Sequence, residues 1–124
     1  MSYKLGTRSK QKLSGVHPDM VAVVKRAIEI TEQDFTVIEG IRNVSRQREL
    51  YKAGKSTTMN SRHLTGHAVD LAPWPISWEW EGFYPIADAM KAAAEELEID
   101  IVWGGDWKSF PDGPHFELSR KTYP

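Results

Sequence analysis

The sequence predicts a small α+β domain, in which an antiparallel sheet is flanked by helices. Two stretches, residues 18–32 and 86–97, repeat apolar side chains at the spacing of a helix that packs on a core. Four shorter stretches have the aromatic, β-branched or alternating composition of strands: residues 35–39, 68–71, 99–103 and 115–118. With 124 residues the chain is long enough for one hydrophobic core, so we expect a single domain over residues 1–124.

The first segment, residues 1–12, is basic and polar, and we expect it to form an arm that packs through Leu5 and Leu13. A helix then begins at Pro18, because proline suits the first helical turn. His17 directly precedes this helix. We expect it to cap the helix or to lie on the surface rather than to bind a ligand.

Arg42 follows the first predicted strand, residues 35–39, where the chain enters a loop. A guanidinium at a strand end can hold a carboxylate or a developing oxyanion through two parallel hydrogen bonds. The alternative is a surface ion pair with Glu39 or Glu49. Both interpretations stay open from the residues alone.

The remaining elements follow in chain order. We expect a short helix capped by Ser45 that ends at Gly54, a rigid aromatic loop over residues 72–85, the helix over 86–97, and the last two strands. Most rings of the aromatic loop are expected to pack, while one or two line a cleft and stack on sugar or peptide.

The chain's chemistry centres on His63 and Asp70, which stand seven residues apart across a turn at Gly66. The segment 68–71 reads as a buried strand that carries the Asp70 carboxylate. An unpaired buried carboxylate is costly, so a cation or strong donors must lie beside it. His115 is the only later histidine, and it completes a set of three zinc ligands with the fourth position open, as in catalytic zinc sites.

Zinc with an open position lowers the pKa of a bound water toward about 7, and hydrolysis also needs a base to take the water proton. We choose Asp112 as this base because it lies on the same turn as His115. Weaker candidates for the base are Glu117 and Asp106, and either Arg42 or His67 can stabilise the oxyanion.

Two other interpretations use the same residues without catalysis. In the first, the residues are unrelated: Asp70 pairs with Arg62, a carbonyl satisfies His115, and Asp112 only forms a turn. In the second, a structural zinc site is closed by a fourth group such as Glu117 or His67.

Composition excludes several partners. The formal net charge of −1 gives no electrostatic footprint for nucleic acid, so we expect no DNA or RNA partner. Without cysteine, a metal must be held by histidine and carboxylate. The N-terminal residues lack the apolar run of a signal peptide, and no window is apolar enough for membrane insertion, so we expect synthesis in the cytoplasm.

Two motifs in this order resemble a known group of enzymes. Ser61-x-His63-x-x-Gly66-x-Ala68-x-Asp70 and Asp112-x-x-His115 are similar to the two motifs of the zinc D-Ala-D-Ala carboxypeptidase/VanY family, which has the LAS fold named after lysostaphin, the D-Ala-D-Ala peptidases and the sonic hedgehog N-domain. Four stretches are most similar to phage endolysins that cut the L-alanyl-D-glutamate bond of peptidoglycan: residues 16–19, 39–42, 61–70 and 103–107.

The resemblance implies one zinc ion per chain on His63, Asp70 and His115, with Asp112 as general base and Arg42 as an electrostatic clamp. Weaker candidates for contacts with the substrate are Ser61, His67 and Gln47. The partner implied is bacterial peptidoglycan. The resemblance further implies a monomer without a separate wall-binding module, which is made in the cytoplasm and delivered to the periplasmic wall by a holin.

The resemblance leaves two rivals to an endopeptidase. A D,D- or L,D-carboxypeptidase would trim a terminal residue of the stem peptide, and a non-catalytic, zinc-stabilised wall-binding domain would not cut at all. Many carboxypeptidase relatives carry glutamate where this chain has Asp112, which fits the endolysin branch better.

Overall fold

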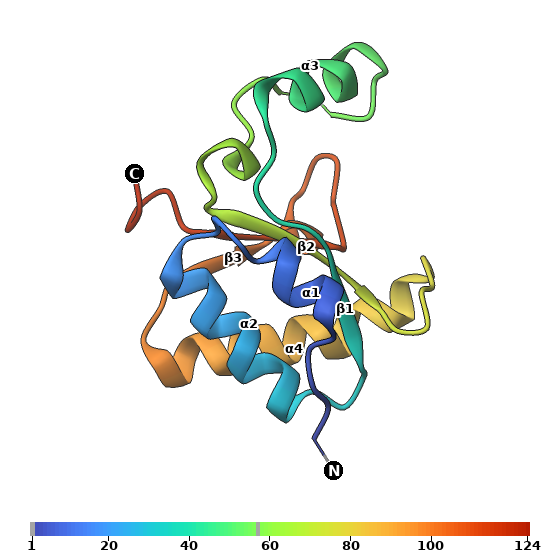
Figure 1. Cartoon of the computed structure of the whole chain (residues 1–124), viewed down its shortest axis with the longest axis vertical. Helices are drawn as coiled ribbons and strands as arrows, with labels where there is room; N and C mark the ends of the chain where they lie inside the picture. The colour runs from blue at the N-terminus through green and yellow to red at the C-terminus, as the bar shows by residue number, and fades with distance from the viewer. Residues whose placement is uncertain (1, 57) are drawn as a thin grey trace.

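The fold is a four-stranded antiparallel sheet with helices packed against it (Figure 1). In this computed structural model, which describes residues 2–56 and 58–124, the strands are β1 (Phe35–Glu39), β2 (Ala68–Pro73), β3 (Ile101–Trp103) and β4 (His115–Leu118). Their order across the sheet is β1-β2-β4-β3, and every neighbouring pair is antiparallel. The predicted α+β class with an antiparallel sheet is confirmed.

The hydrophobic core lies between one face of the sheet and two helices, α2 (Pro18–Ile30) and α4 (Trp80–Leu97), which pack on each other (Figure 1). The core is built from side chains of both layers that are almost fully buried, including Met20, Val24, Leu71, Ile86, Met90 and Phe116. The helix predicted over residues 18–32 is therefore present and ends two residues earlier. The opposite face of the sheet is left for polar side chains.

The helix α1 (Thr7–Lys12) covers the outer edge of β1. Its buried Ser9 accepts a hydrogen bond of 2.9 Å from the backbone N–H of Val37 and lies 3.1 Å from the Thr36 hydroxyl. The first bond satisfies one backbone donor of β1, and α1 covers this edge of the sheet. The arm expected over residues 1–12 is thus partly helical, and Met1 lies outside the described residues.

The helix α4 begins at Trp80, six residues before its predicted start, and it contains Pro85. The expected aromatic loop is correspondingly shorter. Pro85 has no N–H, so the helix loses only the hydrogen bond to the Glu81 carbonyl. The first turns are anchored by Phe83, whose ring lies 6.3 Å from the rings of Trp78 and Trp80. Tertiary packing here outweighs the local preference of proline.

The helix caps differ in part from expectation. His17 caps α2, because its Nδ1 accepts the Asp19 N–H at 3.0 Å, which confirms the capping role. The helix α3 (Val44–Lys52) is capped by Asn43, whose side chain accepts from Arg46, so the expected cap at Ser45 is wrong by two residues. The strand expected over residues 99–103 is shorter and begins at Ile101.

Two short 3-10 helices, η1 (Arg62–Thr65) and η2 (Gly104–Asp106), lead into the functional part of the chain. Across the described residues, no helix combines the length and the apolar character needed to cross a membrane.

Candidate metal centre and catalytic cleft

Strand pairing brings Asp70 and His115 together on the face of the sheet away from the helices. Asp70 of β2 is directly opposite His115 of β4 in the antiparallel register. On the other side of β2, a bulge in β1 between Val37 and Glu39 sets Glu39 opposite Asp70. The extra residue turns the Glu39 side chain to the same face as Asp70, which is a common use of bulges near functional sites.

His63 reaches the same place from η1, whose last turn ends at Gly66. Gly66 has a φ of +76°, and a Cβ there would lie 2.7 Å from the Gly15 carbonyl oxygen, so the turn needs glycine. The Gly66 carbonyl also accepts the His17 N–H at 2.8 Å. The turn is therefore fixed against the start of α2, and with it the position of His63.

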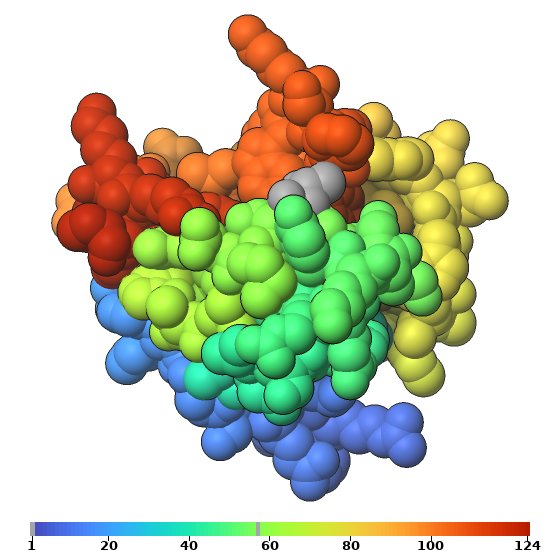
Figure 2. Space-filling view, turned by 90° about the horizontal axis from the view of Figure 1, so that it is seen from above, coloured from blue at the N-terminus to red at the C-terminus, as the bar shows by residue number. Residues whose placement is uncertain are grey.

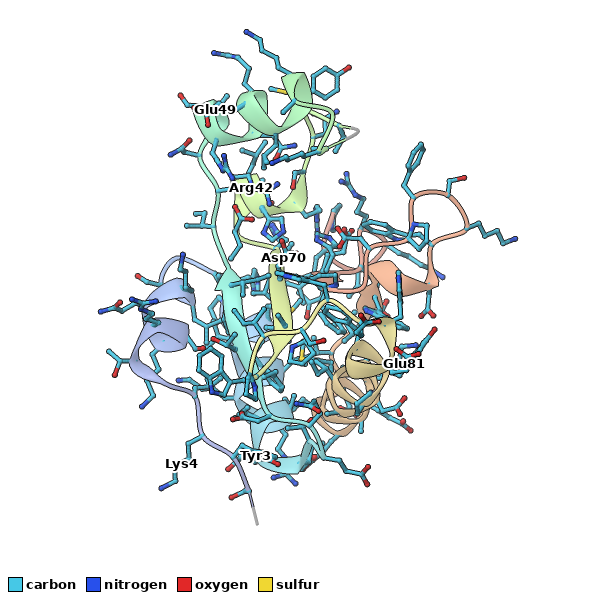
Figure 3. All side chains as sticks on the ribbon, turned by 90° about the vertical axis from the view of Figure 1, so that its right-hand side faces the viewer. Tyr3, Lys4, Arg42, Glu49, Asp70 and Glu81 are labelled. Carbon is cyan, nitrogen blue, oxygen red and sulfur yellow. The ribbon has the colours of Figure 1, made fainter. Side chains whose placement is uncertain are left out.

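The three side chains form one cluster. His63 Nε2 lies 3.1 Å from Asp70 Oδ1, and His115 Nδ1 lies 3.2 Å from the same oxygen. One ligand atom from each residue falls within a group whose members are all within 4.8 Å of one another. Both histidines are buried, while Asp70 is partly open to the cleft. Figure 3 shows Asp70 just below Arg42.

Hydrogen bonds to the far nitrogens fix which atoms can bind a metal. His63 Nδ1 donates to the Gly40 carbonyl at 2.8 Å, and His115 Nε2 donates to the Glu117 carboxylate at 2.8 Å. In a neutral ring the other nitrogen then carries a lone pair. Both lone pairs point at Asp70, so three acceptors converge, and a divalent cation fits this donor set.

Internal hydrogen bonds shift the pKa values of the cluster. Burial alone would raise the pKa of Asp70, but hydrogen bonds from His115 and His63 lower it far below its usual range. Burial lowers the pKa of His115, whereas hydrogen bonds to Asp70 and Glu117 outweigh this and raise it to about 9.

Asp112 lies on the loop that precedes β4, and Gly104 positions this loop. The Asp112 N–H donates to the Gly104 carbonyl at 2.9 Å, and a Cβ on Gly104 would come within 2.5 Å of the Asp112 carbonyl oxygen. Partial desolvation raises the pKa of Asp112, and the charge of Asp70 adds to this effect. Its carboxyl group therefore binds a proton more readily than an ordinary aspartate.

Arg42 faces Asp70 from the other side and is held rigidly. Its Nε and Nη2 donate to the two oxygens of Glu39 at 2.7 and 2.6 Å, and its Nη1 donates to Gln47 at 2.6 Å. Nη2 also lies 3.8 Å from Asp70 Oδ2. Five N–H groups are available on a guanidinium, so two remain for a further acceptor.

A cleft of about 980 Å³ runs over this cluster. One wall comes from α3 and the segment before η1, and the other from the loop between η2 and β4 (Figure 2). The lining side chains that concern the chemistry are Arg42, Ser61, His63, Asp70, Trp107, Phe110, Asp112 and His115. The candidate ligands, the acid group and the guanidinium thus share one open space.

Comparison with known proteins identifies the chain. Residues 1–123 match the family described as phage L-alanyl-D-glutamate peptidase. The chain belongs to this family.

A curated member from Escherichia phage T5, named L-alanyl-D-glutamate peptidase, is 36% identical, with 99% of this chain and 94% of that protein aligned. The crystal structure of the Serratia marcescens L-Ala D-Glu endopeptidase ChiX is 47% identical and superposes with a TM-score of 0.94 over 99% of this chain and 95% of that one. The vancomycin resistance D,D-dipeptidase VanXYg shares the fold at 17% identity, with a TM-score of 0.58 over 83% of this chain and 50% of that one. The LAS fold and the peptidase family implied by the motifs are confirmed, and the chain is an enzyme.

Two residues of this L-alanyl-D-glutamate peptidase that were expected to contact the substrate lie away from the cleft. Gln47 is fully buried, and its amide donates to Ser56 Oγ and the Thr58 carbonyl while its oxygen accepts from Arg42. His67 Nδ1 lies 2.6 Å from the Thr65 hydroxyl, and the residue is absent from the cleft lining. Neither fits the role of a substrate contact.

Ser61 does line the cleft, although its hydroxyl also accepts the His63 N–H and so caps η1. The weaker choices for the base are placed elsewhere: Asp106 pairs with Lys91 at 2.8 Å, and Glu117 faces the far nitrogen of His115. The pairing of Asp70 with Arg62 is wrong, because Arg62 instead donates to the carbonyls of Leu118 and Tyr123.

Sequence reasoning offered the pair of Arg42 and Glu39 only as a surface alternative, whereas the Arg42 side chain is buried, and it missed two other parts of the site. Glu39 orients Arg42, the Gly40 carbonyl orients His63, and the Trp107 ring lies 5.1 Å from the ring of His115. The first two lie within Glu39-Gly40-x-Arg42, a stretch that could have indicated them.

Proposed function

We propose that this chain hydrolyses the amide bond between L-alanine and D-glutamate in peptidoglycan stem peptides, with one zinc ion held by His63, Asp70 and His115. The observation that carries the proposal is the convergence of two imidazole lone pairs and one carboxylate oxygen within 4.8 Å on the floor of a cleft. The names of the family and of its members support the bond that is cut.

A zinc ion held by His63, Asp70 and His115 would supply Lewis-acid chemistry and so would make water a better nucleophile at neutral pH. Asp112 serves as the general base: it takes the proton from the attacking water and returns it to the departing amine nitrogen. Its raised pKa suits the first transfer, since a carboxylate with a higher pKa is a better base toward the water proton.

Arg42 holds the substrate. The two N–H groups not used by Glu39 and Gln47 are available to a substrate carbonyl or to the carboxylate of the D-glutamate residue next to the scissile amide. Ser61 lies on the same cleft and is proposed as a further polar contact. We propose that this whole unit acts at the cell wall as a single, monomeric peptidase domain delivered by a holin.

The test is digestion of purified muropeptides by protein of known metal content, with products identified by mass. We expect one zinc per chain, loss of activity on chelation, recovery with zinc, and products that begin with D-glutamate. Release of free D-alanine would instead establish a carboxypeptidase, and zinc without any cleavage would establish a binding domain.

Variants sharpen the assignment of the ligands. His63→Ala and Asp70→Ala should lose zinc and activity together, because the two remaining ligands hold the ion poorly. The matched control is His17→Ala, which removes a histidine that caps α2 outside the cluster. Tight stoichiometric zinc in either ligand variant would contradict the assignment.

A further inference from the structure

A second cavity lies along the outer edge of the sheet, apart from the catalytic cleft. Its volume is about 580 Å³, and we name it the basic groove. Its lining comes from α1 and the residues before it, from β1, and from the loop after β2: Lys4, Gly6, Thr7, Arg8, Ser9, Lys12, Asp34, Phe35, Thr36, Val37, Ile38, Trp74 and Ile76. None of these residues lines the catalytic cleft.

The charge of the basic groove is unbalanced. Lys4, Arg8 and Lys12 line it against one carboxylate, Asp34, which accepts the backbone N–H of Phe35. Among residues 2–56 and 58–124, none of the three cations takes part in an ion pair. In a chain whose formal net charge is −1, this is a local excess of positive charge.

The cations stand on a fixed support. Arg8 and Lys12 are four residues apart on α1, so both side chains leave the same face of the helix. Ser9 of that helix is tied to the backbone N–H of Val37. The fold therefore sets the backbone positions of Arg8 and Lys12, so the helix itself needs no ordering when an anion binds.

The opposite wall is aromatic and apolar. Trp74 is 52% exposed and Ile76 is 49% exposed, although both belong to types of side chain that normally pack inside. A flat exposed indole offers a face on which a sugar ring can stack, and cations beside it can pair with carboxylates. The combination suits an anionic glycopeptide better than a purely apolar partner.

We infer that the basic groove is a second binding surface for peptidoglycan, which takes a stem peptide through its carboxylates and a sugar of the glycan strand on Trp74. This inference rests on the proposed function. The groove is lined by α1 and β1, whereas α3 lines the catalytic cleft. Figure 1 shows α3 at the top of the molecule and α1 and β1 below it. An intact wall presents many stem peptides, so binding at the groove raises the effective concentration of substrate at the cleft.

The test measures binding and cleavage separately. Binding uses the Asp112→Asn variant, sedimented with purified sacculi at low and high salt. We expect salt to weaken binding. Adding Lys4→Ser, Arg8→Ser and Lys12→Ser should weaken it on the order of tenfold at low salt, because three exposed charge pairs are lost.

Trp74→Ala should also weaken binding, and Trp74→Phe should restore most of it. The matched control removes three cations from the surface outside both cavities, through Lys25→Ser, Arg48→Ser and Lys52→Ser. It should bind sacculi as tightly as the parent, and thermal unfolding of all variants checks that they are folded.

In the active enzyme, the groove substitutions should slow solubilisation of sacculi and leave cleavage of a short soluble muropeptide unchanged. Equal sacculus binding by parent and groove variant, or an equal loss in the control variant, would overturn the inference. So would binding to anionic lipid vesicles with no binding to sacculi. Failure to cleave the soluble muropeptide would instead count against the proposed function, so the two failures are distinguishable.

Discussion

Removal of the Glu117 carboxylate is expected to weaken metal binding, although Glu117 is not a ligand. Its oxygen accepts the His115 Nε2–H at 2.8 Å and so directs the Nδ1 lone pair toward Asp70. In Glu117→Ala the imidazole can turn or take the other tautomer. Loss of such a partner typically costs 10- to 100-fold in metal affinity, or about 1.4 to 2.7 kcal/mol.

The assay is competition for zinc against a chromophoric chelator, on protein first stripped of metal. Glu117→Gln serves as the intermediate case, because the amide oxygen can still accept the imidazole N–H while the charge is lost. Its affinity should fall between those of the parent and Glu117→Ala. Glu95→Ala removes an exposed carboxylate on α4 outside both cavities and should bind zinc as the parent does.

An affinity of Glu117→Ala within twofold of the parent would refute the reasoning, because His115 would then be oriented without Glu117. Equal losses in Glu117→Gln and Glu117→Ala would show that the negative charge, rather than the hydrogen bond, supports the ligand. Thermal unfolding of the stripped proteins separates either result from a general loss of structure, since Glu117 is buried on β4.

Three further substitutions test other parts of the cleft. Asp112→Asn should keep its zinc and lose about 10²- to 10⁴-fold in turnover of muropeptides, and parent-like turnover would exclude it as the base. Gly104→Ala places a Cβ 2.5 Å from the Asp112 carbonyl oxygen and 3.0 Å from His115 Cβ. We therefore expect the free energy of unfolding, measured in denaturant, to fall by about 1 to 3 kcal/mol. An unchanged denaturation midpoint would contradict the close approach. Gln47→Leu removes the acceptor for Arg42 Nη1, so kcat/KM should fall about tenfold while the zinc content stays the same. An unchanged kcat/KM would show that Glu39 alone holds Arg42.

The sheet and the metal cluster could be predicted because each depends on a short-range pattern. β4 alternates His115 and Glu117 with Phe116 and Leu118, which indicates a strand with one polar face. The spacing of His63 and Asp70 across Gly66 indicates a turn that returns the chain to the same place. Both features are local, so they are visible in the sequence.

Features that depend on contacts between elements were not predictable in the same way. Gln47 stands on a polar helix, and only the loop around Ser56 and Thr58 makes it a buried link to Arg42. The bulge that turns Glu39 toward Asp70 has no residue signature of its own. In each case the direction of a side chain is set by contacts outside its own helix or strand.

The cleft also shows why fold and function are inseparable here. Asp70 meets His115 only in the observed register of β2 and β4, and a slip of one residue would turn His115 toward the core face that Phe116 now fills. The buried apolar residues of β4 therefore hold the ligands in place. Because the three ligands converge only in this register, a metal that binds them stabilises the folded chain in proportion to the logarithm of its concentration over the dissociation constant. The same pairing that builds the core thus creates the site, and occupation of the site in turn stabilises the core.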